Sequence, residues 1–196
     1  MTEDGDAGLA ERRGLDEAVV YQPAEDSGLL AEAAVAEAHG RVLEVGTGSG
    51  WVAHQITEER GLDVVGSDLN PHAVRQARDR GVEAVVADLL APFRADAFDT
   101  LCFNPPYLPT DPDNEWDDWM ERALSGGESG RALIDPFLAD AGRVLAPDGV
   151  VLLLVSSLTG FEEVLGLVED AGFDAERVVE ESFPFETLTV LVLRRA

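Results

Sequence analysis

The segment Asn104-Pro105-Pro106-Tyr107 carries the residue types best suited to chemistry. Proline has a fixed φ and no backbone N–H, so the two prolines stiffen the segment and leave carbonyl oxygens free as acceptors. The Asn104 side-chain amide adds a donor and an acceptor, and Tyr107 adds a flat face. This set can accept both N–H bonds of a planar –NH₂ group and aim its nitrogen lone pair. The segment therefore predicts a site for such a group, against the alternative of a proline-rich turn that closes a strand.

A glycine-rich turn, Gly46-Thr47-Gly48-Ser49-Gly50, follows the apolar run 42–45. Glycines at alternate positions let the backbone approach a ligand closely and open a helix N-terminus. The dinucleotide fingerprint has a third glycine at the position that Trp51 occupies, which counts against NAD and FAD. The turn predicts a nucleoside-type ligand, and a purely structural tight turn is the alternative.

Two acids follow the next two apolar runs. Asp68 ends the run 64–67, about 20 residues after the glycine turn, where an acid accepts hydrogen bonds from ribose hydroxyls. Asp88 follows the run 82–86 and can take the amino group of an adenine, while Leu89 covers its ring. The alternatives are a dipole partner for the following helix in the case of Asp68, and a solvated loop acid in the case of Asp88. These segments contain no basic residue, so they predict a nucleoside without phosphates.

The elements that must position these residues alternate between strand and helix. Apolar runs predict strands over 42–45, 64–67, 82–86, 98–103, 150–155, 173–181 and 187–193, and helical patterns cover 25–38, 51–60, 70–80, 132–145 and 161–171. Asn70-Pro71 predicts an N-cap with proline at the first helical position, and 147–149 predicts a turn. The alternation predicts an α/β fold with a seven-stranded, mostly parallel sheet and helices on both faces. Ligands of such sheets bind at the carboxyl ends of the strands.

The composition excludes several classes of protein. The 196 residues predict one domain over 18–196 after a flexible tail over 1–17. All 14 basic residues are arginines, which excludes a P-loop lysine and a Schiff-base lysine. One cysteine, Cys102, excludes a disulfide scaffold and is expected to be buried, and three scattered histidines argue against a metal site. Neither a signal peptide nor a membrane span is evident, so we expect a soluble, cytoplasmic protein.

The chain carries 39 acidic residues and a formal net charge of −25. Acidic surfaces stay hydrated, and multimolar salt screens their mutual repulsion, so adaptation to a salty habitat is favoured over an acidic surface evolved for one basic partner. Phosphate binding needs clustered Lys and Arg, so direct nucleic-acid binding is not expected.

Together these segments resemble class I S-adenosylmethionine-dependent methyltransferases of the HemK type. The resemblance is strongest to the short archaeal and eukaryotic branch that methylates the glutamine in the Gly-Gly-Gln loop of class I peptide chain release factors. It covers nearly the whole chain after residue 18. The matching stretches are Val20–Ser27, Leu43–Gly46, Asp68–Pro71, Phe103–Tyr107, Ser125–Arg131 and Glu186–Leu188.

The resemblance implies a Rossmann-like fold, S-adenosyl-L-methionine as cofactor, S-adenosyl-L-homocysteine as product and N5-methylation of glutamine. Family positions that contact the methyl donor correspond to Ser27, Glu44, Gly46, Asp68, Asp88, Leu89 and Asn104, and the glycine turn adds Gly48. The target nitrogen is expected to bind Asn104, Pro105, Pro106 and Tyr107, with its two N–H groups on the Asn104 side-chain oxygen and the Pro105 carbonyl. The branch also implies a small zinc-binding activator subunit that would cover an apolar strip, for which the closing strands and the segment next to the tail are candidates. The zinc belongs to that partner.

Two departures from the family pattern bear on the packing over the donor and on the substrate contacts, respectively. Gly28 stands where an aromatic residue is common, and the loop 108–125 is unusually acidic. Trp116 and Trp119 lie in this loop, either as anchors of a lid or as peptide contacts. The open alternatives are a lysine side chain, adenine N6 or guanine N2 as acceptor, a non-catalytic scaffold with the same fold, and an NAD oxidoreductase.

Overall fold

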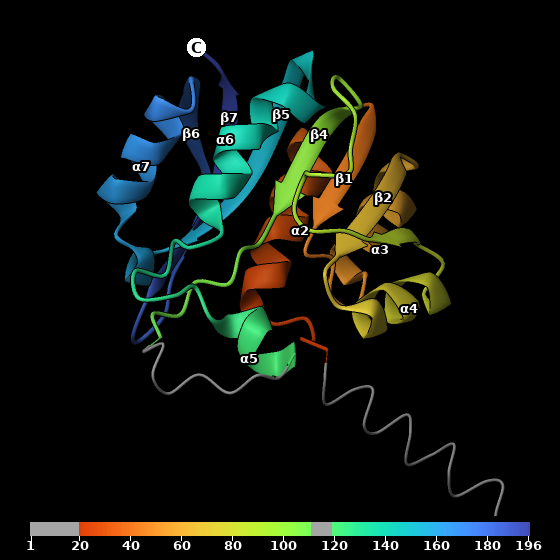
Figure 1. Ribbon diagram of the computed structural model, residues 1–196, viewed down its shortest axis with the longest axis horizontal. Coiled ribbons are helices and arrows are strands. Elements are labelled where there is room, and N and C mark those ends of the chain that lie inside the picture. Colours follow the sequence, from red (N-terminus) through yellow and green to blue (C-terminus); the bar gives the residue numbers. More distant parts are fainter. Residues whose placement is uncertain (1–19, 111–118) are drawn as a thin grey trace, which may run out of the picture.

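The computed structural model describes residues 20–110 and 119–196, so the tail predicted over 1–17 and Trp116 lie outside the described residues. The described part contains one seven-stranded sheet in the order β3-β2-β1-β4-β5-β7-β6 (Figure 1). Its strands are β1 (Arg41–Val45), β2 (Asp63–Asp68), β3 (Glu83–Val86), β4 (Phe98–Phe103), β5 (Leu145–Ser156), β6 (Phe173–Ser182) and β7 (Thr187–Arg195). β1 to β5 run parallel, and β7 is antiparallel to both β5 and β6. The predicted fold class and mostly parallel sheet are confirmed.

The helices lie on both faces of the sheet, as predicted. They are α2 (Glu25–Glu37), α3 (Trp51–Arg60), α4 (Pro71–Asp79), α5 (Trp119–Leu124), α6 (Ile134–Val144) and α7 (Phe161–Asp170), with a short 3₁₀ turn at Ser157–Thr159. Asn70 caps α4 as expected, because its side chain accepts a hydrogen bond from the His72 backbone N–H. Among the described residues, no helix is both long enough and apolar enough to cross a membrane.

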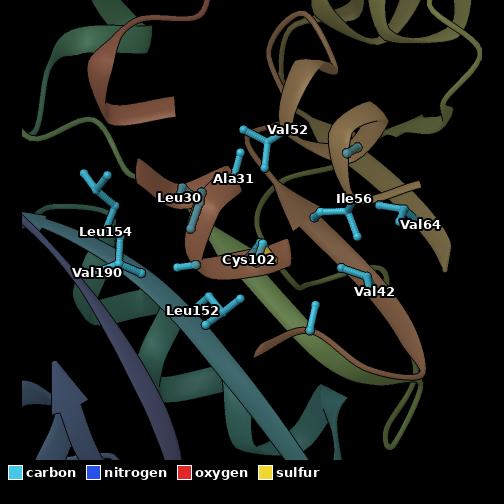
Figure 2. Close-up of a cluster of buried hydrophobic side chains, with 14 of the residues drawn as sticks. Leu30, Ala31, Val42, Val52, Ile56, Val64, Cys102, Leu152, Leu154 and Val190 are labelled. Atoms are coloured by element: carbon cyan, nitrogen blue, oxygen red, sulfur yellow. The ribbon is translucent and has the colours of Figure 1, made fainter. Parts of the chain in front are cut away.

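Alternation along the strands divides the core into two clusters, one on each face. In β4, Cys102 packs with α2, α3 and α4 on one face, whereas Leu101 and Phe103 pack with α6 and α7 on the other. In β5, Leu152 and Leu153 divide in the same way. Figure 2 shows the first cluster, in which side chains of α2 and α3 meet the strand residues around Cys102. Burial on both faces explains the continuous apolar runs of the sequence.

Two elements differ from the sequence prediction. The residues 147–149, predicted as a turn before a strand, lie inside β5, which begins at Leu145. Phe98 pairs with Leu145 and Thr100 with Val150, so the turn-forming residues make a bulge within the strand. Helix α5 lies in the stretch predicted as a long loop. Six residues are too few to show a helical period in the sequence.

The order of the strands reverses between β1 and β4, where the chain after β1 and the chain after β4 lie next to each other. Such a reversal is the usual ligand site of an open α/β sheet. Figure 1 shows α5 beyond the arrowhead ends of β1 and β4, on the same side as this reversal.

Gly50, the last glycine of the turn after β1, should tolerate alanine poorly. Its φ is +75°, and an added Cβ would lie 2.8 Å from Ala77 Cα and 2.7 Å from Ala77 Cβ. We expect Gly50→Ala to lower the free energy of unfolding by about 3 kcal/mol, from left-handed backbone strain plus overpacking. Gly61 is the matched control, because its φ is +63° but no atom lies within 4 Å of an added Cβ. Urea unfolding should show a loss of about 1–2 kcal/mol for Gly61→Ala, and equal losses for the two variants would contradict this account.

Candidate active site

All the predicted site residues meet in one cleft at the carboxyl ends of β1, β2 and β4. The cleft is lined, among other residues, by Ser27, Glu44, Gly46, Gly48, Asp68, Asp88, Leu89, Asn104, Pro105, Pro106 and Tyr107. These residues come from five separate stretches of the chain. Four of the stretches lie at the carboxyl ends of parallel strands, which share one edge of the sheet, and Ser27 comes from α2.

The glycine turn is held in place by two carboxylates. Glu44 Oε2 accepts from the Thr47 hydroxyl at 2.5 Å and from the Ala53 backbone N–H at 3.0 Å. Asp68 Oδ2 accepts from the Gly48 backbone N–H at 2.9 Å. Gly46 and Gly48 have φ values of +66° and +53°, the left-handed region that glycine adopts without strain. The turn is thus a rigid wall of the cleft.

Asp68 is placed for both roles considered from the sequence, of which the bond to ribose hydroxyls stays a prediction. Its Oδ1 accepts from the Asn70 backbone N–H at 2.8 Å, just before α4, while the side chain also lines the cleft. Burial raises the pKa of Asp68, against the lowering effect of the Asn70 and Gly48 N–H groups. Each carboxylate oxygen offers about two lone-pair sites, so two backbone bonds leave capacity for a ligand hydroxyl.

Asp88 and Leu89 form the far wall of the cleft after β3. Asp88 is exposed and Leu89 is partly buried. Leu89 has a φ of +44°, which is uncommon for a residue other than glycine. Backbone strain of this kind concentrates at ligand sites, and the placement of Leu89 over a ligand ring stays a prediction.

Asn104 presents an unused acceptor. Its Nδ2 donates to Asp26 Oδ2 at 3.0 Å, whereas its Oδ1 is buried and has no hydrogen-bond partner. A buried polar atom without a partner costs free energy, so each instance in a native protein calls for an explanation. A ligand N–H donor at Oδ1 supplies one.

Asp26 and Tyr21 line the cleft but were not among the predicted site residues. Asp26 is 3% exposed and accepts from the Tyr21 hydroxyl at 3.0 Å. An acid in the first turn of a predicted helix normally indicates interaction with the helix dipole. For this reason the sequence analysis did not place Asp26 in the cleft. Its bond to Asn104 joins residues 78 positions apart, which one sequence does not reveal.

Helix α5 also contributes residues to the cleft, of which the sequence indicated only Trp119. Trp119, Arg122, Ala123 and Leu124 line the cleft, and the Arg122 guanidinium lies 5.4 Å from the centre of the Trp119 ring. An isolated β-bridge pairs Leu108 with Ser125, so the chain after α5 lies beside the segment that follows Tyr107. The predicted lid is thus partly a helix over the cleft.

The charge around the cleft is mostly negative. Four acidic side chains line it, of which Glu44 keeps its proton at neutral pH and the others are Asp26, Asp68 and Asp88, and Arg122 is the basic residue of the described lining. Such a lining favours a cationic ligand over a phosphate. Among the described residues, no group of three or more His, Cys, Asp or Glu side chains could hold a metal ion.

The two tyrosines of the cleft stay protonated at neutral pH. Burial, followed by the charge of Asp26, raises the pKa of both Tyr21 and Tyr107 above the ordinary value of 10, and Glu186 raises that of Tyr107 further. A neutral phenol donates hydrogen bonds but takes up no proton, so neither tyrosine can act as a general base.

Glu44 should make stability depend on pH. Burial raises the pKa of Glu44 from 4.5 to about 8, against the opposing bonds from Thr47 and Ala53. Between these pH values the folded protein keeps a proton that the unfolded chain releases, so the free energy of unfolding falls as pH rises, by up to about 1.4 kcal/mol per pH unit. Glu44→Gln should remove this contribution and gain stability relative to the wild type from pH 5 to pH 8. Urea unfolding at both pH values tests this, and parallel curves for the two proteins would contradict it.

The comparisons with known proteins point to one group of enzymes. A family described as a methyltransferase domain matches residues 42–126, which include the glycine turn, Asp68 and Asn104. A protein of Methanocaldococcus jannaschii with the provisional name protein N5-glutamine methyltransferase is 36% identical over 178 residues, covering 88% of this chain and 90% of the relative. Human Methyltransferase HEMK2 is 33% identical over 188 residues, covering 88% of each chain.

A solved structure gives the same result. The Mtq2–Trm112 complex of E. cuniculi, described as responsible for methylation of the translation termination factor eRF1, contains a chain with a TM-score of 0.75 and 31% identity. The match covers 91% of the present chain and 99% of that chain. The similarity therefore extends over whole domains rather than one motif.

Proposed function

The chain belongs to the HemK-type protein N5-glutamine methyltransferases, and on this premise we propose that it methylates the glutamine in the Gly-Gly-Gln loop of a class I peptide chain release factor. The proposed donor is S-adenosyl-L-methionine and the product S-adenosyl-L-homocysteine. The observation that carries the proposal is the unpaired, buried Oδ1 of Asn104 beside two prolines in the cleft. A release factor as substrate implies a cytoplasmic enzyme.

The wall formed by the glycine turn, Asp68, Asp88 and Leu89 fits the donor. The left-handed glycines keep side chains out of the space over the turn, and Asp68 has lone pairs left for ribose hydroxyls. The mostly acidic lining suits a ligand with a sulfonium charge and lacks the basic cluster that a pyrophosphate needs. When bound, S-adenosyl-L-methionine supplies an electrophilic methyl group. Ser27, Glu44 and Gly46 complete the proposed donor site.

The acceptor site is proposed on the opposite side of the cleft. A glutamine side chain ends in a planar –NH₂ group whose lone pair is delocalised, so it is a poor nucleophile. Acceptance of its two N–H bonds by Asn104 Oδ1 and the Pro105 carbonyl favours electron density on the nitrogen. Pro106 stiffens the segment, and Tyr107 confines the amide plane. The proton leaves to water, since neither cleft tyrosine can accept it.

We further propose that a small zinc-binding activator covers the outer edge of the sheet near the donor wall. Leu69 and Val86 are 50% and 56% exposed there, at the ends of β2 and β3. The solved relative from E. cuniculi is a complex with Trm112, which supports a partner of this kind. The sequence analysis also named the two closing strands as candidates for this contact. Of these, β7 is excluded, because its residues from Leu188 to Leu193 are buried.

The test is transfer of a labelled methyl group to the release factor at low and at multimolar salt. The acceptors are the wild-type factor and a variant with the glutamine of its Gly-Gly-Gln loop replaced, each with and without the activator. Label that requires this glutamine supports the proposal, and dependence on the activator supports the heterodimer. Donor binding without label on the release factor would refute the substrate, and lysine side chains, adenine N6 and guanine N2 would then be the acceptors to test.

A further inference from the structure

Asp26 is a buried carboxylate to which the mechanism above gives no task. It is 3% exposed, lies in the first turn of α2 and lines the cleft. Its Oδ1 accepts from the Ser27 backbone N–H at 2.6 Å and from the Ser27 hydroxyl at 3.2 Å. Its Oδ2 accepts from the Tyr21 hydroxyl and from Asn104 Nδ2, both at 3.0 Å. In the described part of the chain these partners are all uncharged, so hydrogen bonds alone offset the cost of burying the charge.

The bond between Asp26 and Asn104 decides which way the Asn104 amide faces. An ionised carboxylate only accepts hydrogen bonds, whereas an amide has one donating and one accepting end. With Nδ2 toward Asp26 the bond forms; with the amide turned over, Oδ1 would meet a carboxylate oxygen, and two acceptors would repel. The carboxylate therefore selects the orientation that leaves Oδ1, and not Nδ2, without a partner at the cleft.

We propose that Asp26 is a positioning residue that locks the Asn104 amide with its oxygen toward the acceptor nitrogen. The inference rests on the proposed function, because an –NH₂ acceptor needs an oxygen opposite its N–H groups. An Asn104 amide that presented Nδ2 would set two donors against each other. Tyr21 and Ser27 have a supporting part, because their donors fix the carboxylate itself.

An exchange of the two side chains tests this through rate. In Asp26→Asn, residue 26 gains a donating end that can pair with Asn104 Oδ1 and so stabilise the wrong orientation. We expect kcat to fall on the order of 10-fold, with the donor Kd and the acceptor KM within about threefold of the wild type. In Asn104→Asp two carboxylates face each other, and kcat should fall on the order of 10²-fold. The double variant Asp26→Asn/Asn104→Asp restores one donor and one acceptor between the residues and still leaves an oxygen for the acceptor, so it should be at least 10-fold faster than Asn104→Asp.

The exchange of the side chains of residues 26 and 104 has a matched control and an outcome that would contradict the proposal. Glu25→Gln removes the same charge one residue away, and we expect kcat within about twofold of the wild type. A merely structural contribution of Asp26 would make the double variant slower than either single variant, and that result would overturn the proposal. If Asp26→Asn alone does not fold, the double variant, in which the bond is restored, still decides.

A second measurement needs no methyl acceptor. In ¹⁵N-labelled protein, the side-chain amide pair of Asn104 is the pair of resonances that disappears in Asn104→Ala. Asp26→Asn should shift or split this pair, and Glu25→Gln should leave it in place; an unmoved pair in folded Asp26→Asn would overturn the proposal. Failure of the wild type to methylate the release factor would count against the proposed function alone, because the resonances report on Asp26 in either case.

Discussion

Asn104→Ala is expected to lower kcat on the order of 10²-fold or more while the donor affinity stays within a few-fold of the wild type. The substitution removes the one buried side-chain acceptor of the cleft that has no partner in the described structure, the Oδ1 of Asn104. The Pro105 carbonyl would then accept one N–H bond alone, and the amide could rotate out of line. Loss of an aligned hydrogen bond at a buried atom costs more than the same loss in water, because the surrounding medium screens charge less.

Three measurements separate chemistry from donor binding and from folding in this prediction. Isothermal titration with S-adenosyl-L-homocysteine gives the affinity on the donor side, and single-turnover transfer gives the rate. Asn104→Ala should also release the Nδ2 bond to Asp26, so urea unfolding is measured alongside, with a loss of about 1–2 kcal/mol expected. Undiminished turnover in a folded variant would show that Asn104 does not bind the acceptor.

Most of the site could be predicted because its residues follow directly after predicted strands. Asp68, Asp88 and Asn104 each follow an apolar run, and parallel strands bring their carboxyl ends to one edge. The alternation of strand and helix patterns also predicted the sheet and its core on both faces. Strands that are buried on both faces appear in the sequence as continuous apolar runs, which are easy to identify. Local patterns were sufficient wherever the positions were set by the sheet itself.

The parts that were missed depend on contacts distant in sequence. Asp26 has the appearance of an ordinary acid in the first turn of a helix, and only its bond to Asn104 reveals a function in the cleft. Helix α5 was missed because six residues carry no full amphipathic pattern, and the bulge in β5 because turn-forming residues also fit within a strand. The cleft residues that α2 and α5 contribute were therefore less predictable than those at the ends of the strands.

The charge of the cleft connects these observations to the choice of ligand. A buried acid is costly unless hydrogen bonds or an opposite charge compensate it. Asp26 is compensated by hydrogen bonds from uncharged donors and, with Asp68 and Asp88, keeps a negative field at the cleft, whereas the buried Glu44 keeps its proton at neutral pH. A sulfonium donor gains from that field, and this gives the acidic lining a function beyond the general acidity of the chain.

Asp68→Ala should weaken donor binding on the order of 10²-fold while the acceptor site stays intact. Hydrogen bonds to a charged group contribute roughly 1.5–3 kcal/mol each, and the lower end of this range, about 3 kcal/mol for two ribose bonds, corresponds to about 10²-fold. The backbone N–H groups of Gly48 and Asn70 also lose their acceptor, so the turn loosens and the effect is reinforced.

The matched control for Asp68→Ala is Asp63→Ala at the other end of β2. Asp63 is an exposed acid paired with Arg41 at 3.1 Å, so its loss removes the same charge from the same strand without touching the cleft. Titration with S-adenosyl-L-homocysteine should show wild-type affinity for Asp63→Ala. 5′-Methylthioadenosine keeps the ribose but lacks the amino-acid group, and an equal loss for both ligands in Asp68→Ala would assign the missing contact to the ribose. Because the second ligand shares only the nucleoside, a loss confined to S-adenosyl-L-homocysteine would instead place Asp68 against the amino-acid end of the donor.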